Sequence, residues 1–191
     1  MRHITLLSVL TLVALDAQAI GLTVGASGAP VGETTPAAET LLASISSPFT
    51  TPDPSGLGGT TGVLISAVYL NAGGTLDFTY QISNNAGSQG SISLTDALSF
   101  ASWVTDVDYL TNGSALPGAS YLTNGTVTPS QVFRSSVGTG VTVGFDFTAS
   151  NIQPGQTSVV LLIRTNATTF TSGLLGLIAG GGANITAFQP H

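Results

Sequence analysis

Two stretches of the chain alternate strictly between apolar and polar residues, residues 75–83 and residues 141–148. A period of two is typical of a β-strand that buries one face and exposes the other. We therefore predict two half-buried strands. Their apolar side chains are expected to share one interior: Leu76, Phe78, Tyr80 and Ile82 from the first strand, and Val141, Val143, Phe145 and Phe147 from the second.

Further strands are predicted before, between and after these two. Residues 63–70 and 158–163 are apolar on both faces, which is typical of central strands covered from both sides or of strands whose outer face meets another surface. Weaker patterns occur at residues 91–94, 103–110, 130–137 and 183–188, whereas 176–182 is interpreted as a loop or the start of a strand. Turn-forming residues separate the strands at 71–74, 84–87, 112–113, 124–125 and 154–155. Short strands without a long 3.6-residue period predict an all-β chain, a single antiparallel, jelly-roll-like β-sandwich over residues 61–191.

The first nineteen residues have the pattern of a secretory signal peptide. Arg2 precedes an apolar run at residues 4–15, and Ala17-Gln18-Ala19 provides the small residues that signal peptidase recognises. The alternative is an N-terminal membrane anchor. A helix of about 12 residues spans only about 18 Å, short of the ~30 Å hydrocarbon core of a bilayer, so the signal peptide is favoured.

Residues 20–60 differ from the rest of the chain. They contain five of the nine prolines and little alternation, so we interpret them as an extended lead-in to the sandwich, with a short helix at 37–45 where Ala, Glu and Leu favour one. An extended, proline-punctuated segment can lie along a partner. We expect the lead-in to act as a detachable tether at the cell surface.

The composition excludes several classes of function. The 191 residues include 6% charged residues, no Lys and no Cys, and the net charge is −6. Binding to nucleic-acid phosphates requires several Lys or Arg, so nucleic acid is excluded as a partner. Loss of the signal peptide would leave His191 as the remaining histidine, which excludes Ser–His–Asp and Cys–His catalysis and zinc sites.

Carboxylates are the remaining catalytic candidates, because a glycosidase minimally needs two of them. Nothing in the sequence pairs the five aspartates considered: Asp77, Asp96, Asp106, Asp108 and Asp146. Asp106 and Asp108 point to the same side of a predicted strand and could offer oxygen ligands to Ca²⁺. No Gly-containing twelve-residue loop accompanies them, so a solvated face is favoured and no catalytic, cofactor or metal residue is assigned.

Three aromatic residues are candidates for a sugar-binding platform. Trp103, the only Trp of the chain, lies near Tyr109 and Tyr121 in the sequence. Aromatic rings stack on sugar rings, but a lone Trp in a sandwich is more often part of the core. The core position is the favoured interpretation for Trp103.

The chain resembles a group of uncharacterised bacterial exported proteins that often carry a PEP-CTERM sorting tail. The likeness covers residues 41–188 and rests on five motifs: LASISSPF at 42–49, GTLDFTYQISN at 74–84, VGFDF at 143–147, IQPGQTS at 152–158 and RTNAT at 164–168. The resemblance implies export, an all-β body and a link to extracellular polysaccharide or biofilm. The sorting tail itself is missing after Phe188-Gln189-Pro190-His191, so release or retention by association is expected.

These observations predict a secreted, non-enzymatic structural or adhesive protein outside the cell or at its surface. A low charge removes the usual protection against pairing of strand edges, so self-association into a homo-oligomer or fibre is expected, as is a link to extracellular polysaccharide. The alternative function is that of a carbohydrate-binding module. No cofactor is expected, and no transmembrane segment is expected after signal cleavage.

Overall fold

The computed structural model describes residues 20–33, 39–52, 58–111, 116, 118–121, 125–138 and 140–191. The predicted signal peptide, the predicted turn at 112–113 and Asn124 of the next turn lie outside these residues. No helix in the described ranges has the length and hydropathy that crossing a bilayer requires.

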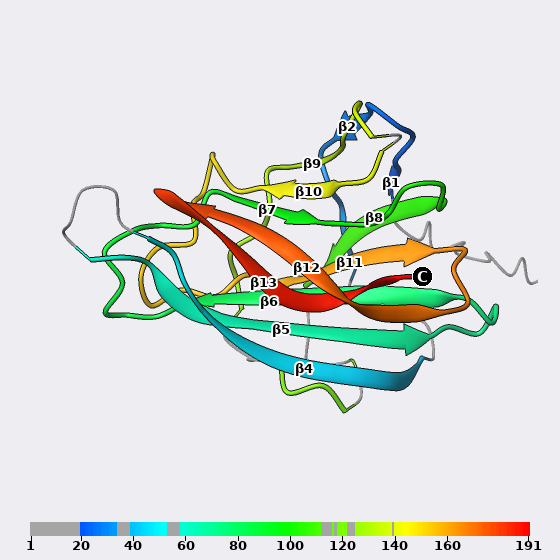
Figure 1. The fold of residues 1–191 in the computed structure, drawn as a ribbon, viewed down its shortest axis with the longest axis horizontal. Helices are drawn as coiled ribbons and strands as arrows, with labels where there is room; N and C mark the ends of the chain where they lie inside the picture. The colour runs from blue at the N-terminus through cyan, green and yellow to red at the C-terminus, as the bar shows by residue number, and fades with distance from the viewer. Residues whose placement is uncertain are drawn as a thin grey trace, which may run out of the picture.

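The described residues form two β-sheets and no helix, which confirms the predicted all-β sandwich (Figure 1). Neighbouring strands are antiparallel, except that β3 pairs with β8 in parallel. Sheet A has the order β1 (Ile20–Gly21), β8 (Thr105–Leu110), β11 (Val160–Thr165), β6 (Leu76–Asn84), β5 (Thr61–Leu70) and β4 (Thr40–Thr50), with β3 (Gly32–Glu33) also on β8. Sheet B has the order β13 (Gly181–Pro190), β12 (Phe170–Ala179), β7 (Leu94–Ala97), β10 (Val143–Asp146), β9 (Gln131–Arg134) and β2 (Ser27–Gly28).

The main core lies between the two sheets. The four predicted apolar residues of β6 are buried in the same cluster as Val143, Phe145 and Phe147. Phe78 meets Phe100 edge to face, with ring centroids 5.7 Å apart. Val141 is an exception, because it precedes β10 and is only partly buried. The predicted facing of the two alternating segments is otherwise confirmed.

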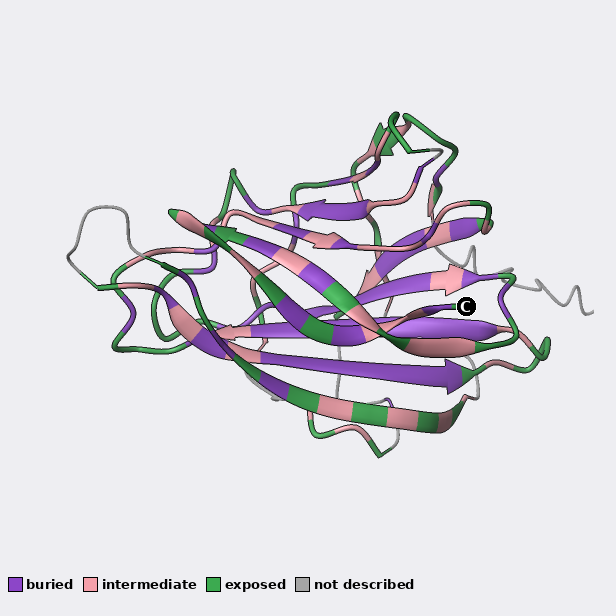
Figure 2. Ribbon diagram, viewed as in Figure 1, coloured by how far each residue is buried: buried purple, intermediate pink, exposed green. Residues whose placement is uncertain are grey.

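The polar face of β6 is buried as well, which the alternation did not predict. Asp77, Thr79 and Gln81 are at most 2% exposed. A second apolar cluster covers this outer face of sheet A, and Figure 2 shows β5 and β6 buried along most of their length. The cluster contains Ala67, Tyr69, Leu110, Leu116, Val160 and Leu162. The prediction of a half-buried strand is therefore wrong for β6, whereas both faces of β5 and β11 are buried as predicted.

The predicted helix at 37–45 is wrong, because β4 occupies residues Thr40–Thr50. This strand pairs with β5 along its length, with a bulge between Leu41 and Ala43. The hydrogen bonds and packing gained along β5 outweigh a modest helix propensity. Pro48 is tolerated because β4 is an edge strand.

The start of the described chain closes one side of the sandwich. Strand β1 pairs with β8 of sheet A, β2 crosses to pair with β9 of sheet B, and β3 returns to β8. The described part of residues 20–60 is thus built into both sheets and differs from the separate lead-in that the prolines suggested.

The C-terminal hairpin covers the opposite side. Strand β12, which the sequence pattern missed, runs into β13 through Gly180, whose φ of 77° favours glycine. The free edge of β13 is bonded by side chains of sheet A. Ser47 Oγ donates to Thr186 O at 2.9 Å, Phe188 N–H donates to Ser66 Oγ at 3.1 Å, and Tyr80 OH donates to Phe188 O at 2.7 Å.

Candidate functional site

Five carboxyl groups gather around Arg164 on the outer face of sheet A. We call this set the Arg164 cluster: Glu33, Glu39, Asp77, Asp106, Asp108 and Arg164. Pairing within the sheet places Asp77 and Asp106 on either side of Arg164. Arg164 Nη1 donates to Glu33 Oε1 at 2.7 Å, and Arg164 Nε lies 3.7 Å from Asp77 Oδ2. One cation thus faces five carboxyl groups, and full ionisation would be strongly unfavourable.

Protons relieve this repulsion. Burial, followed by the neighbouring Asp77 carboxylate, raises the pKa of Glu39 to about 8. Burial raises the pKa of Asp108 to about 7, although its Oδ1 accepts a hydrogen bond from the Tyr109 N–H at 2.8 Å. No N–H or hydroxyl group of the described residues donates to the buried oxygens of Glu39, so its contact with Asp77 requires a proton on Glu39.

The Arg164 cluster joins the ends of β3 and β4 to the middle of sheet A. It brings together Asp77, Asp106 and Asp108, which the sequence singled out, with Glu33, Glu39 and Arg164, which it did not. No signal in the sequence links the two groups, since they meet only through strand pairing. Within the described ranges, no group of three or more His, Asp or Glu side chains has an arrangement that could hold a metal ion. The cluster therefore holds β3 and the start of β4 against the middle of sheet A through polar contacts.

The two other aspartates lie elsewhere. Asp146 Oδ1 accepts a hydrogen bond from the Thr148 N–H at 2.7 Å, which stabilises the turn after β10. Asp96 lies on β7 and faces outward from sheet B, because its neighbours Thr95 and Ala97 are buried. Neither residue belongs to the Arg164 cluster.

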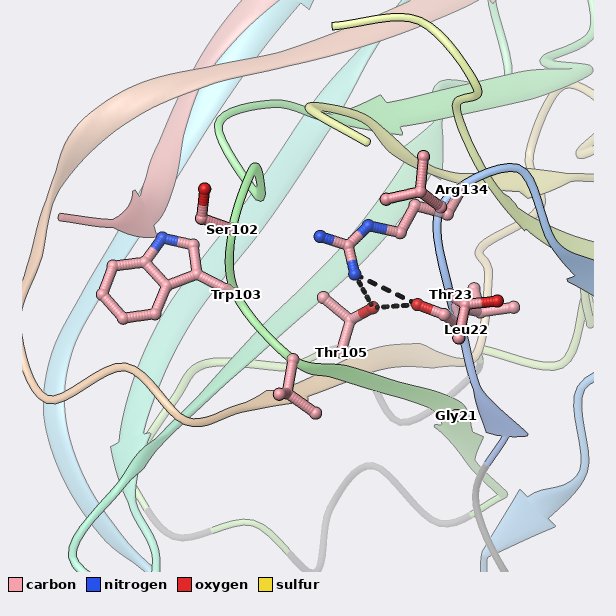
Figure 3. Close-up of a pocket in the computed structure, with 9 residues that line it drawn as sticks. Gly21, Leu22, Thr23, Ser102, Trp103, Thr105 and Arg134 are labelled. Carbon is pink, nitrogen blue, oxygen red and sulfur yellow. Dashed lines mark hydrogen bonds between the residues drawn. The ribbon is translucent and has the colours of Figure 1, made fainter. Parts of the chain in front are cut away.

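Trp103 lines a pocket of about 470 Å³ at the side closed by β1 and β2. The segment before β8 and the segment after β1 form its walls, and Val24 and Val104 leave apolar surface exposed there. The lining consists of Gly21, Leu22, Thr23, Val24, Ser102, Trp103, Val104, Thr105 and Arg134 (Figure 3). Trp103 is only partly buried, so the interpretation of Trp103 as a core residue is wrong.

Arg134 contributes a buried positive charge to the same pocket. Its guanidinium donates to Leu22 O, Thr105 Oγ1, Gly140 O and Phe100 O, over 2.7–3.1 Å. These bonds use four of its five N–H groups. No carboxylate of the described residues lies within ion-pair distance, and burial alone lowers the pKa of Arg134. The indole of Trp103 points away from the guanidinium in Figure 3, so a ligand here would meet an aromatic surface and a cation separately.

The two tyrosines do not complete a platform with Trp103. Tyr109 is partly buried against the main core. Tyr121 packs against the second apolar cluster, and its hydroxyl is hydrogen-bonded to Thr79 on the outer face of sheet A. The predicted three-residue aromatic platform is therefore not assembled, and Trp103 is its one member in the pocket.

Comparison with known proteins returned no matching family model, no matching curated protein and no matching solved structure.

Proposed function

We propose that the protein is a non-enzymatic, adhesive or structural extracellular protein that attaches to polysaccharide. The observation that carries the proposal is the pocket that Trp103 and Arg134 both line, where no carboxylate of the described residues pairs with the buried Arg134 guanidinium. The resemblance to exported PEP-CTERM-type proteins implies the same setting. Export, adhesion and the absence of catalysis are parts of the proposal.

The two functional surfaces of the pocket favour an acidic polysaccharide. A sugar ring can pack its C–H face against the indole and the exposed valines, since aromatic side chains provide a large apolar surface. A carboxylate or sulfate on the same sugar would be attracted by the Arg134 charge, which no carboxylate of the described residues neutralises. The net charge of −6 repels an acidic polymer. Salt screens this repulsion beyond about 10 Å at 0.1 M ionic strength, so the attraction to Arg134 outweighs it only at short range.

The test is binding to polygalacturonate and to sulfated and neutral polysaccharides on one array. We expect Trp103→Ala to weaken binding to the acidic polymers at least tenfold and to leave the melting temperature unchanged. Val137→Ala is the control, because Val137 is 76% exposed and lies outside the pocket. Absence of binding to any polysaccharide would overturn the proposal, and binding that survives Trp103→Ala would remove this pocket from it.

A second measurement addresses catalysis. We expect no new reducing ends after prolonged incubation with each polymer that binds, at pH values on both sides of neutrality. Release of reducing ends that disappears in Asp77→Asn or Asp106→Asn would instead assign hydrolysis to the Arg164 cluster.

A further inference from the structure

A second hollow, of about 270 Å³, lies on the outer face of sheet B. It is lined by Asp96 of β7, residues Gly176 to Ile178 of β12 and Gly182 to Asn184 of β13. Pairing places Asn184, Gly176 and Asp96 next to one another across three strands. It shares no lining residue with the Trp103 pocket.

Glycine forms the floor of this hollow. A Cβ atom at Gly176 would lie 3.6 Å from Asp96 Cβ and 3.8 Å from Asn184 Oδ1, so both polar side chains flank the bare backbone of Gly176. Gly182 lies opposite Ile178 in the pairing of β12 with β13, and Ile178 is 46% exposed. The hollow therefore has a flat floor, two polar walls and one apolar wall.

Packing on the other side of Asp96 fixes its carboxylate. Gly144 of β10 is its neighbour there, and Asp96 Oδ1 would lie 2.7 Å from a Cβ at Gly144. The Phe133 ring covers the same glycine and occupies the space that a Cβ atom there would need. Among the described residues, nothing donates a hydrogen bond to Asp96 Oδ1, which is buried. Burial raises the pKa of Asp96 from its ordinary value.

We propose that this hollow binds one unit of a neutral hexose, with Asp96 accepting hydrogen bonds from its hydroxyl groups. Asn184 can both donate to and accept from a neighbouring hydroxyl, and Ile178 offers an apolar contact for ring C–H groups. The volume is below the roughly 300–1,000 Å³ of sites for drug-sized ligands, which fits a single sugar ring. An acidic sugar is excluded, since the described lining of the hollow holds a carboxylate and no cation.

The proposal deepens the proposed attachment to polysaccharide and rests on it. Two separate sugar sites on one body would hold a polymer more strongly than either alone, because the second contact forms at a high effective concentration. The two sites differ in charge, so acidic and neutral ligands separate them.

The experiment is a titration of ¹⁵N-labelled protein with glucose, mannose and galactose, monitored by NMR. For at least one hexose, we expect the largest shifts at the backbone amides of Gly176 and Gly182 and the side-chain amide of Asn184. Asp96→Ala and Asn184→Ala are each expected to weaken binding at least tenfold. Thr186→Ala is the matched control, since Thr186 is exposed on the same strand and outside the hollow.

The outcomes separate the two proposals. Absence of shifts at the hollow with all three hexoses at concentrations up to tens of millimolar overturns the hexose site, whatever the acidic polymers do. Equal weakening by Thr186→Ala, or hexose binding that appears only with added Ca²⁺, also overturns direct recognition by Asp96. Loss of acidic-polymer binding with hexose shifts intact would reject the Trp103 pocket and keep this site. If Asp96→Ala fails to fold, Asp96→Asn takes its place, because Asn preserves the shape of the side chain. We expect Asp96→Asn to weaken hexose binding as well.

Discussion

Phe145 belongs to the main core and is fully buried. Replacing it with Ala should cost about 3–5 kcal/mol, because the ring leaves a cavity that the sheets cannot fill. That is a large share of the ~5–15 kcal/mol that stabilises a typical domain. Urea unfolding measures the loss. Val137→Ala should change the free energy of unfolding by no more than about 0.5 kcal/mol, as exposed substitutions usually do. Equal midpoints for the two variants would show that the facing of β10 is wrong.

Residues with an unusual partner were the hardest to predict from the sequence. Phe145 could be placed because alternation reports burial directly. Arg164 could not, since its partners Glu33 and Asp77 come from strands far apart in the chain. Trp103 was assigned to the core because a lone Trp in a β-sandwich is usually buried there. In the structure it lies just before β8 and forms part of a pocket wall. The local pattern of apolar and polar residues therefore predicts whether a residue is buried more readily than it predicts which residues it contacts.

The Arg164 cluster makes the attachment of β3 and β4 depend on pH. The carboxyl groups of Glu39 and Asp108 bind protons more tightly in the folded chain than in the unfolded chain, because burial raises their pKa values to about 8 and about 7. Their contribution to stability is therefore fully present below the ordinary carboxyl pKa near 4. It falls as the pH rises and is lost by about pH 8.

Thermal melts between pH 4 and pH 9 test this dependence. We expect Glu39→Gln to raise the melting temperature at pH 8 and to have little effect at pH 4, since Gln keeps a donor toward Asp77 without the charge. Asp146→Asn, outside the cluster, should leave the pH profile unchanged. A melting temperature that rises steadily up to pH 8 would contradict the protonated state of the cluster.

Deleting residues 20–60 should unfold the protein, because the deletion removes β1 to β4 and exposes the edges of β5, β8 and β9. It also removes Leu22 and Phe49 from the main core. Near-ultraviolet circular dichroism and hydrogen exchange of the truncated chain would measure the effect. A folded truncation with an unchanged melting temperature would restore the idea of a detachable tether.

The sequence predicted strands where it shows either clear alternation, as in β6, or a continuous apolar run, as in β5 and β11. Strand β4 was missed because its Ala and Leu residues also suit a helix, and only the pairing with β5 decides between the two. Strand β12 was missed because its glycines resemble a loop, although Gly176 lies in the middle of a ladder between β7 and β13. Pairing partners distant in sequence decided both cases.

At the scale of the whole molecule, the long edges are protected without charged residues. Pro48 and a bulge interrupt β4, side-chain hydroxyls bond the edge of β13, and two-residue strands cap the other side. The predicted self-association would therefore run through sheet faces, where Leu174 is exposed on β12 outside the lining of the hexose hollow.

Size-exclusion chromatography and electron microscopy test this prediction. We expect concentration-dependent oligomers that Leu174→Ser shifts toward monomer, with Val137→Ser as the control. A monomer that persists at high concentration would contradict self-association.

The closing of one side by β1 and β2 also determines when the fold can be completed. These strands come first in the described chain, yet their partners β8 and β9 come far later. A chain made from its N-terminus must wait for Gln131–Arg134 before β2 has a neighbour. Such long-range pairing slows folding. This side of the sandwich therefore closes only after β8 and β9 have been made, and β1 and β2 stay unpaired until then.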